Sequence, residues 1–199
     1  MPTNLGLGVD CINRSYTCQV VTPAPPQPER YAEVVQAAIR AFARKGYGGT
    51  TLADIAVEAG VSQPRISQIF GNKENAFIEA HKVASKEVLS LLAANAEPPF
   101  SIERMGAGYV QLMQERREVL LMIFQALTSS YVPSIGDEAR RVINEVTTLV
   151  VDQAGGTHED AVAFLERGFF IHAMMAARVF DHVGDYPETG KLLDTVRIS

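Results

Sequence analysis

The sequence predicts an all-α protein in which an N-terminal three-helix, helix-turn-helix domain precedes a helical ligand-binding and dimerisation domain. Apolar residues recur at helical spacing over nearly all of the chain beyond residue 29, and no strand-like alternation extends past a few residues. Glycines and prolines interrupt this pattern at intervals typical of short loops. With 199 residues, of which 47% are hydrophobic and 21% charged, the composition excludes wholesale disorder and a disulfide scaffold.

Charge is distributed unevenly along the chain, whose net charge is −5. Residues 29–76 carry six Lys/Arg and five Asp/Glu, whereas residues 97–199 carry nine Lys/Arg and fifteen Asp/Glu. An anion-binding surface is therefore expected only in the first domain. The start lacks the basic and apolar regions of a signal peptide, and the apolar run Val119–Phe124 is too short to span a bilayer. We expect a cytoplasmic protein without a membrane partner.

Residues 1–28 have no helical period and end in a proline-rich run, which predicts an extended or disordered arm. Cys11 and Cys18 lie in this arm, and their spacing does not resemble a metal site. Reduced thiols of an intracellular protein are the favoured interpretation, and pairing or oxidation is the alternative. Neither a metal nor a cofactor is predicted.

The first domain is predicted over residues 29–89. An apolar stripe predicts a helix over about 30–45, which the glycines at 46, 48 and 49 end. Thr51 and Asp54 have the spacing of a capping box at the start of a short helix.

Gly60 is expected to end that short helix. Ser62 is the expected N-cap of another short helix, with Pro64 in its first turn. The pair Gly71-Asn72 then precedes a long helix from about Lys73 to Asn95.

The segment Ala59-Gly60-Val61-Ser62 joins the two short helices in the pattern of a helix-turn-helix. Counting 100° per residue places Pro64 and Gln68 opposite the apolar side of the second helix. Arginine pairs with guanine and glutamine with adenine in the major groove, so this helix is suited to reading bases. Hydroxyls and a cation near the helix starts suit phosphates. The predicted DNA-binding residues are Thr50, Thr51, Ser62, Gln63, Arg65, Ser67, Gln68 and Lys73.

The segments 42–47, 50–56, 59–62 and 70–74 together resemble the TetR-type (tetracycline-repressor-like) transcriptional regulators. The resemblance covers about residues 29–89. It implies a three-helix DNA-binding domain, a long linking helix, a divergent helical ligand-binding domain and a homodimer.

The chain departs from this family at three positions of the second short helix. The family usually has Gly at Pro64, Tyr at Ser67, and Tyr or His at Ile69. Because the family's Tyr commonly touches a phosphate, the shorter Ser67 makes that contact weaker or absent. Gln63, Arg65 and Gln68 are therefore assigned from helix geometry. Few phosphate contacts in each subunit favour two half-sites of a palindromic operator, with recognition helices about 34–36 Å apart or a multiple of that distance.

The second domain is predicted over residues 90–199. Its helices are expected at about 101–115, 117–129, 137–154, 158–181 and 188–196. The gaps between them contain Pro133, Gly155-Gly156, Gly184 and Pro187.

The segment 168–177 is apolar almost all round, so its helix should be covered on two sides. A second subunit, with 137–154 or 188–196 as a neighbour, is the favoured cover, and a helix wholly inside one subunit is the alternative. Large flexible side chains around it predict an effector pocket, although each is also ordinary core filler. Its predicted residues are Met105, Tyr109, Met113, Phe124, Phe169, His172 and Met175. For His172, a satisfied core or interface role ranks before a ligand contact, and a metal ligand ranks last.

These features predict a DNA-binding repressor released from its operator by a small apolar effector that shifts the conformational population. The rival is a helical-bundle enzyme or binding protein without a DNA role. Against an enzyme, the histidines form no metal-site spacing and no nucleophile motif is present. An activator, or an adaptor that binds protein, is a third possibility.

Overall fold

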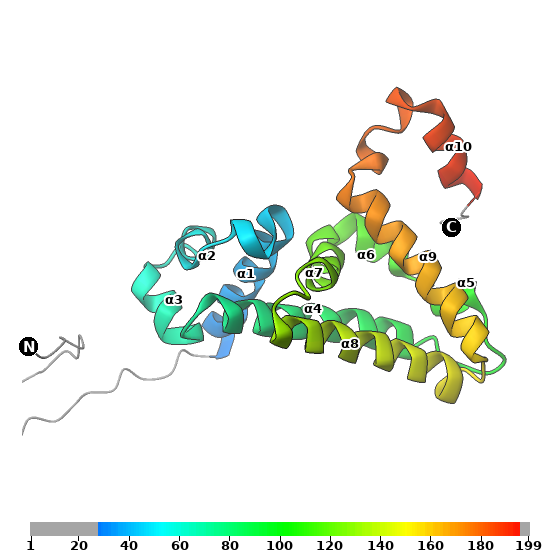
Figure 1. The fold of residues 1–199 in the computed structure, drawn as a ribbon, viewed down its shortest axis with the longest axis horizontal. Helices are drawn as coiled ribbons and strands as arrows, with labels where there is room; N and C mark the ends of the chain where they lie inside the picture. Colours follow the sequence, from blue (N-terminus) through cyan, green and yellow to red (C-terminus); the bar gives the residue numbers. More distant parts are fainter. Residues whose placement is uncertain (1–27, 196–199) are drawn as a thin grey trace, which may run out of the picture.

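The computed structural model describes residues 28–195, and within that range every regular element is a helix (Figure 1). This confirms the predicted all-α fold. The predicted arm up to residue 27, with Cys11 and Cys18, lies outside the described residues. The helices are α1 Pro28–Gly49, α2 Leu52–Ala59, α3 Gln63–Phe70, α4 Lys73–Ala93, α5 Ile102–Met105, α6 Tyr109–Glu115, α7 Arg117–Thr128, α8 Pro133–Thr148, α9 His158–Ala176 and α10 Pro187–Thr195.

Helices α1, α2 and α3 form one end of the molecule, and α9 and α10 lie at the other (Figure 1). The buried rings of Phe42 and Phe77, whose centroids are 5.0 Å apart, join α1 to α4 beneath the short helices. Ile55 and Ile66 close this core from α2 and α3, and both are fully buried. Each short helix is thus fixed by its apolar side, which leaves its opposite side for solvent.

The turn between α2 and α3 follows from its residues. Thr51 and Asp54 form the predicted capping box, and Gly60 ends α2 in the left-handed conformation with a φ of 64°. Ser62 occupies the N-cap position of α3, but its side chain makes no capping hydrogen bond. The reason is that Pro64 has no N–H and the N–H of Arg65 donates to the Ser62 carbonyl.

Helix α4 continues from the first helices into the second half, where α7 and α8 pack against it and α9 packs on both (Figure 1). The Arg116 guanidinium ties these parts together. It donates to Gln36 of α1 at 2.7 Å and pairs with Glu87 of α4 at 3.4 Å and Glu118 of α7 at 2.9 Å. The domain limits 29–89 and 90–199 stay a prediction.

Several predicted limits in the second half are wrong. The expected helix 101–115 is two helices, because Gly108 has a φ of 82° and the chain turns between α5 and α6. Helix α8 begins at Pro133 rather than 137, since proline fits a first helical turn. Helix α9 ends at Ala176 rather than 181, where the chain turns and Arg178 has a φ of 57°.

Among residues 28–195, no single helix combines the length and apolar character needed to cross a bilayer. A π-helical turn, Leu149–Gln153, continues α8. In the range 28–195, one pair of helices passes that test together, namely α7 and the segment Pro133–Gln153, and the two are bent by 120° relative to each other.

Candidate functional site

The outer side of α3 is a small polar surface. Gln63, Pro64 and Gln68 are exposed, and Arg65 is half-buried. The Nη1 of Arg65 donates to Oε1 of Gln68 at 3.3 Å, so the two predicted base-reading side chains lie next to each other. Ile66, on the opposite side, is buried. The geometry therefore presents the amide and guanidinium groups away from the rest of the chain, as a groove-reading helix requires.

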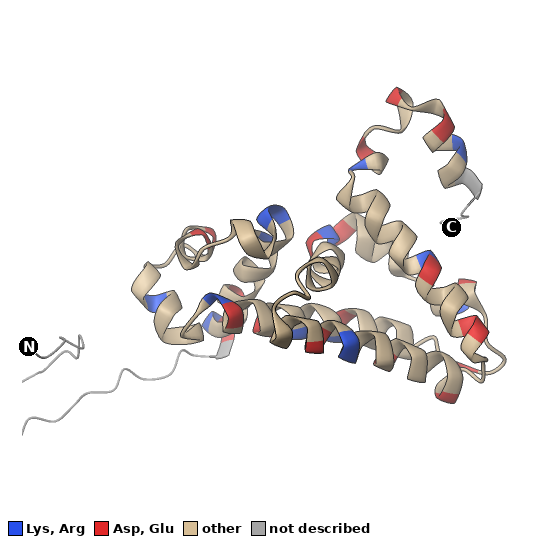
Figure 2. Cartoon of the chain, in the orientation of Figure 1, with Lys and Arg blue, Asp and Glu red and all other residues tan. Residues whose placement is uncertain are grey.

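The electrostatic field around α3 is weak. Arg65 is the one charged residue of this helix (Figure 2). On the neighbouring helices, Arg40 and Arg44 both donate to Glu58, and Lys45 donates to Asp54 at 2.6 Å. Hydrogen bonds from the arginines lower the pKa of Glu58, and the Lys45 hydrogen bond, followed by Thr51, lowers that of Asp54. Much of the basic charge of α1 is thus neutralised within the chain.

The predicted phosphate-binding side chains are placed differently from one another. Thr50 is fully buried, and its hydroxyl donates to the carbonyl of Gly46 at 2.7 Å. This hydroxyl is therefore used within the chain, at the kink of α1, and does not face solvent. The Thr51 hydroxyl is exposed but shared with Asp54. The Lys73 Nζ donates to the Tyr47 carbonyl at 2.9 Å and lies 4.4 Å from the centre of its ring. Ser62 is exposed and Ser67 half-buried.

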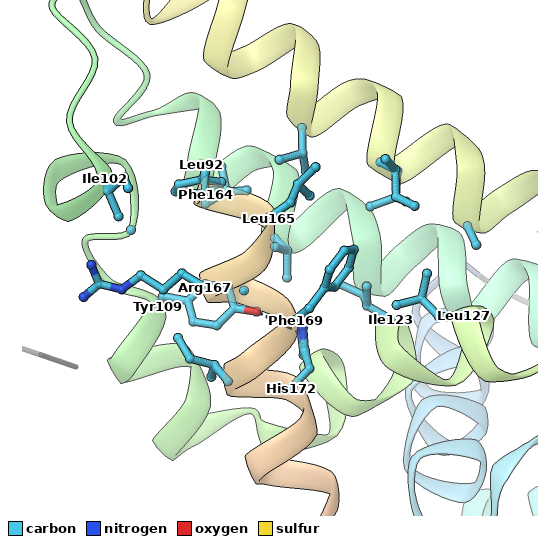
Figure 3. A pocket seen from close by; sticks show the side chains of 18 of the residues that line it. Leu92, Ile102, Tyr109, Ile123, Leu127, Phe164, Leu165, Arg167, Phe169 and His172 are labelled. Carbon is cyan, nitrogen blue, oxygen red and sulfur yellow. Dashed lines mark hydrogen bonds between the residues drawn. The ribbon is translucent and has the colours of Figure 1, made fainter. Parts of the chain in front are cut away.

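A second candidate site is a cavity of about 130 Å³ among helices α4 to α9 (Figure 3). Its surface is mostly apolar, which suits a small apolar molecule. Among the side chains that line it are Val88 and Leu92 of α4, Ile123 and Leu127 of α7, Val142 and Val146 of α8, and Phe164 and Leu165 of α9. The sequence does not indicate these residues as pocket residues, because a helical stripe predicts burial but not which buried residues border a cavity.

Tyr109 and His172 form a hydrogen-bonded pair at this cavity. The Tyr109 hydroxyl lies 2.8 Å from Nε2 of His172, as the dashed line in Figure 3 marks. Burial lowers the pKa of His172 to about 4, partly opposed by the Gly168 carbonyl, and burial raises the pKa of Tyr109. Both groups are therefore neutral at pH 7.

His81 of α4 also lines the cavity, and its side chain is 0% exposed. Burial lowers its pKa to about 4, against the opposing effect of the Glu138 carboxylate. The sequence patterns did not indicate a role for His81, because its spacing from the other histidines only excluded a metal site. The available signal was its position one turn after Phe77 on the buried side of α4.

The residues predicted for the pocket separate into two groups. Tyr109, Phe169 and His172 line the cavity. The rest lie outside its lining: the methionines fill close-packed space, and Phe124 stacks on the His172 imidazole. This second group is Met105 and Met175, each 1% exposed, the half-buried Met113, and Phe124.

The apolar side of α9 is covered on one side only in the single chain. Ile171, His172 and Met175 are buried against the neighbouring helices, whereas Val162 is 55% and Phe169 37% exposed. The predicted cover on two sides is thus not supplied by residues 28–195 of the same chain. In that same range, no group of three or more His, Cys, Asp or Glu side chains is arranged to hold a metal ion.

Comparison with known proteins places both sites in context. Residues 34–80 match the family described as bacterial regulatory proteins, tetR family. The chain is 32% identical over 118 residues to the HTH-type transcriptional regulator TtgR of Pseudomonas putida, an overlap of 59% of this chain and 49% of that regulator. The chain therefore spans about half the length of this relative.

Two solved structures share the fold. A TetR-like transcriptional regulator from Rhodococcus sp. RHA1 matches with a TM-score of 0.59 and 21% identity, over 77% of this chain and 87% of that one. The multidrug binding protein EbrR, solved in complex with imidazole, matches with a TM-score of 0.58 and 21% identity, over 77% and 81%.

Proposed function

We propose that this chain, whose residues 34–80 match the tetR family of bacterial regulatory proteins, is a DNA-binding transcriptional repressor. A small apolar molecule releases it from its operator. The observation that carries the proposal is the polar outer side of α3, where Arg65 and Gln68 lie 3.3 Å apart at the exposed end of the molecule.

In this proposal α3 enters the major groove, where Gln63, Arg65 and Gln68 read base edges. The exposed Thr51 and Ser62, together with Ser67 and Lys73, are assigned to phosphates. Thr50 is assigned no side-chain contact because its hydroxyl is buried. With so few unpaired cations, each subunit contributes a small electrostatic attraction, and affinity requires two half-sites bound together.

A homodimer supplies the second half-site. The exposed apolar side chains Val162 and Phe169, which lie two turns apart on α9, support an interface between two copies, since exposed apolar surface is a candidate for cover by a partner. The two recognition helices would then face successive major grooves of a palindromic operator.

The cavity supports control by an effector. Helices α4 and α7 both line it, and both also pack against α1, so a molecule that fills the cavity acts on the elements that position α3. An effector that binds the DNA-incompatible conformer more tightly shifts the population toward it. A difference of about 3 kcal/mol in affinity changes operator occupancy more than a hundredfold.

The test is selection of bound DNA from a random pool with the full chain, followed by gel-shift titration of the selected sequence. We expect a palindromic half-site, and at least tenfold weaker binding by Arg65→Ala/Gln68→Ala. The matched control is Arg140→Ala/Gln114→Ala, which removes the same side-chain types from exposed positions on α8 and α6. Equal binding by both double variants would overturn the assignment of α3, and no enrichment of any sequence would overturn the DNA role.

A further inference from the structure

The imidazole of His81, a residue that lines the cavity, is a buried polar group without a hydrogen bond. Its side chain is 0% exposed, and neither ring nitrogen has a hydrogen-bond partner among the described residues. Buried polar groups are normally paired, so an unpaired nitrogen in a cavity wall marks a place where a bound molecule supplies the partner. The ring is held in place by Phe77, which stacks on it with an interplanar angle of 8°.

The surroundings of His81 determine which partner is missing. Nδ1 lies 3.6 Å from the Glu138 carboxylate, which favours the proton on that nitrogen. Glu138 in turn accepts hydrogen bonds from Arg141 at 2.9 and 3.0 Å. Nε2 of the neutral ring is then an acceptor, and it requires a donor from the ligand.

The second polar point of the cavity is also an acceptor. The Tyr109 hydroxyl donates its proton to Nε2 of His172 when Nδ1 of that ring carries the other proton. Nδ1 of His172 is itself buried without a hydrogen-bond partner among the described residues. The phenolic oxygen retains lone pairs and no proton for a ligand. Neither His81 nor the Tyr109–His172 pair offers a full charge at pH 7, because burial holds both imidazoles and the phenol neutral.

The cavity volume indicates the size of molecule that it accommodates. About 130 Å³ compares with an apolar cavity of about 150 Å³ that accommodates benzene. A single ring with a short substituent fits such a space. The two charged residues that line the cavity, Arg167 and Glu103, pair with each other at 3.7 Å. The rest of the lining is neutral at pH 7, which disfavours carboxylates and ammonium groups, since burying an unpaired charge is costly.

We propose that the effector is a neutral single-ring molecule with a hydroxyl or N–H group, of which a simple phenol is the model, and that this group donates a hydrogen bond to Nε2 of His81. This inference rests on the proposed effector role of the cavity. His81 thereby acts as the specificity-determining residue of that site.

The experiment is isothermal titration calorimetry of the full chain with two probes, 4-ethylphenol and 4-ethyltoluene. The probes have the same size and differ in a hydroxyl or a methyl group. We expect His81→Leu to weaken 4-ethylphenol binding about tenfold relative to 4-ethyltoluene, which corresponds to about 1.4 kcal/mol. His81→Gln retains an acceptor and should keep the preference of the wild type.

A measurement on the unchanged protein keeps the proposal testable if His81→Leu does not fold. In ¹⁵N spectra, the Nε2 signal of His81 should shift upfield with 4-ethylphenol and remain in place with 4-ethyltoluene. Equal loss of both probes in His81→Leu, or no shift of the Nε2 signal, would overturn the inference and leave the cavity as a binding site. If neither 4-ethylphenol nor 4-ethyltoluene binds, both the inference and the effector role are overturned. The calorimetry and the ¹⁵N spectra contain no DNA, so they do not test the proposed DNA function. The selection experiment tests that function separately.

Discussion

The hydroxyl of Tyr109 lies 2.8 Å from Nε2 of His172 and connects α6 to α9 in the wall of the cavity. Since α6 has no fully buried residue of its own, this hydrogen bond is a specific element of its attachment. Phe124 stacks on the same imidazole with centroids 6.0 Å apart, so the ring is held at one edge and on one face. The position of α6, and with it the cavity wall, depends on this pair.

Tyr109→Phe is therefore expected to destabilise the chain. The substitution keeps the ring but leaves Nε2 of His172 buried without a partner, which costs about 1–2 kcal/mol. Urea denaturation followed by circular dichroism measures the change in the free energy of unfolding. Tyr186→Phe is the control, because Tyr186 is 66% exposed, and it should leave the midpoint unchanged. An unchanged midpoint for Tyr109→Phe would show that the hydrogen bond contributes no stability.

Stability should also decrease as the pH is lowered through the range where the buried histidines titrate. Burial lowers the pKa of His81 and His172 to about 4, from the ordinary value of 6.5. Between these values the unfolded chain binds more protons than the folded one, so acidification favours unfolding. We expect the free energy of unfolding to decrease by up to about 1.4 kcal/mol per pH unit for each histidine from about pH 6.5 to 4, with no further contribution below.

Urea titrations between about pH 7 and 5 test this dependence. His172→Gln and His81→Gln should each reduce the slope, whereas His158→Gln, at an exposed position, should retain it. A slope that is the same in all three variants contradicts the assignment to the buried rings. The window above pH 5 avoids the range in which the lowered pKa values of Glu58 and Asp181 contribute.

Local signals predicted the first helices well. The capping box of Thr51 and Asp54 and the turn at Gly60 depend on residues within a few positions of one another, so they can be recognised in the sequence. The break between α5 and α6 was missed because a glycine inside an apolar helical pattern is ambiguous. At Gly108 an added Cβ would lie 2.9 Å from Cδ1 of Leu91, a contact that depends on tertiary packing.

The two candidate sites also differed in how far the sequence could predict them. Exposure of Gln63 and Gln68 follows from the helical period of α3 once Ile66 and Phe70 are buried. The cavity required the packing of α4 against α8 and α9, and this packing places His81 in its wall. Apolar composition alone favoured the methionines, which fill the core instead.

Gly60→Ala should destabilise the helix-turn-helix by about 1 kcal/mol. An added Cβ meets no atom within 4 Å there, so the penalty comes only from the φ of 64°, which disfavours residues with a side chain. Gly48→Ala is the matched control, since its Cβ also meets nothing within 4 Å and its φ is not positive. Thermal denaturation should show a lower midpoint for Gly60→Ala alone, and equal midpoints for the two variants would rule out backbone strain at Gly60.

Arg116→Ala should weaken the coupling between the cavity and the DNA-binding end. Arg116 donates to Gln36 of α1 and pairs with Glu87 of α4, so it joins α7, which lines the cavity, to the helices that carry α3. Its side chain is 35% exposed, and we expect a loss of only about 1 kcal/mol in stability. The effect of 4-ethylphenol on operator affinity should fall about threefold or more, in line with mutations that alter coupling.

Arg117→Ala provides the comparison for that experiment. The neighbouring Arg117 pairs with Asp181 at 2.8 Å and donates to the Met175 carbonyl, and it therefore links α7 to the segment after α9 rather than to α1. Gel-shift titrations with and without the phenol should show full coupling in Arg117→Ala and reduced coupling in Arg116→Ala. Equal coupling in both variants would mean that the signal passes from the cavity through α4 without the Arg116 contacts.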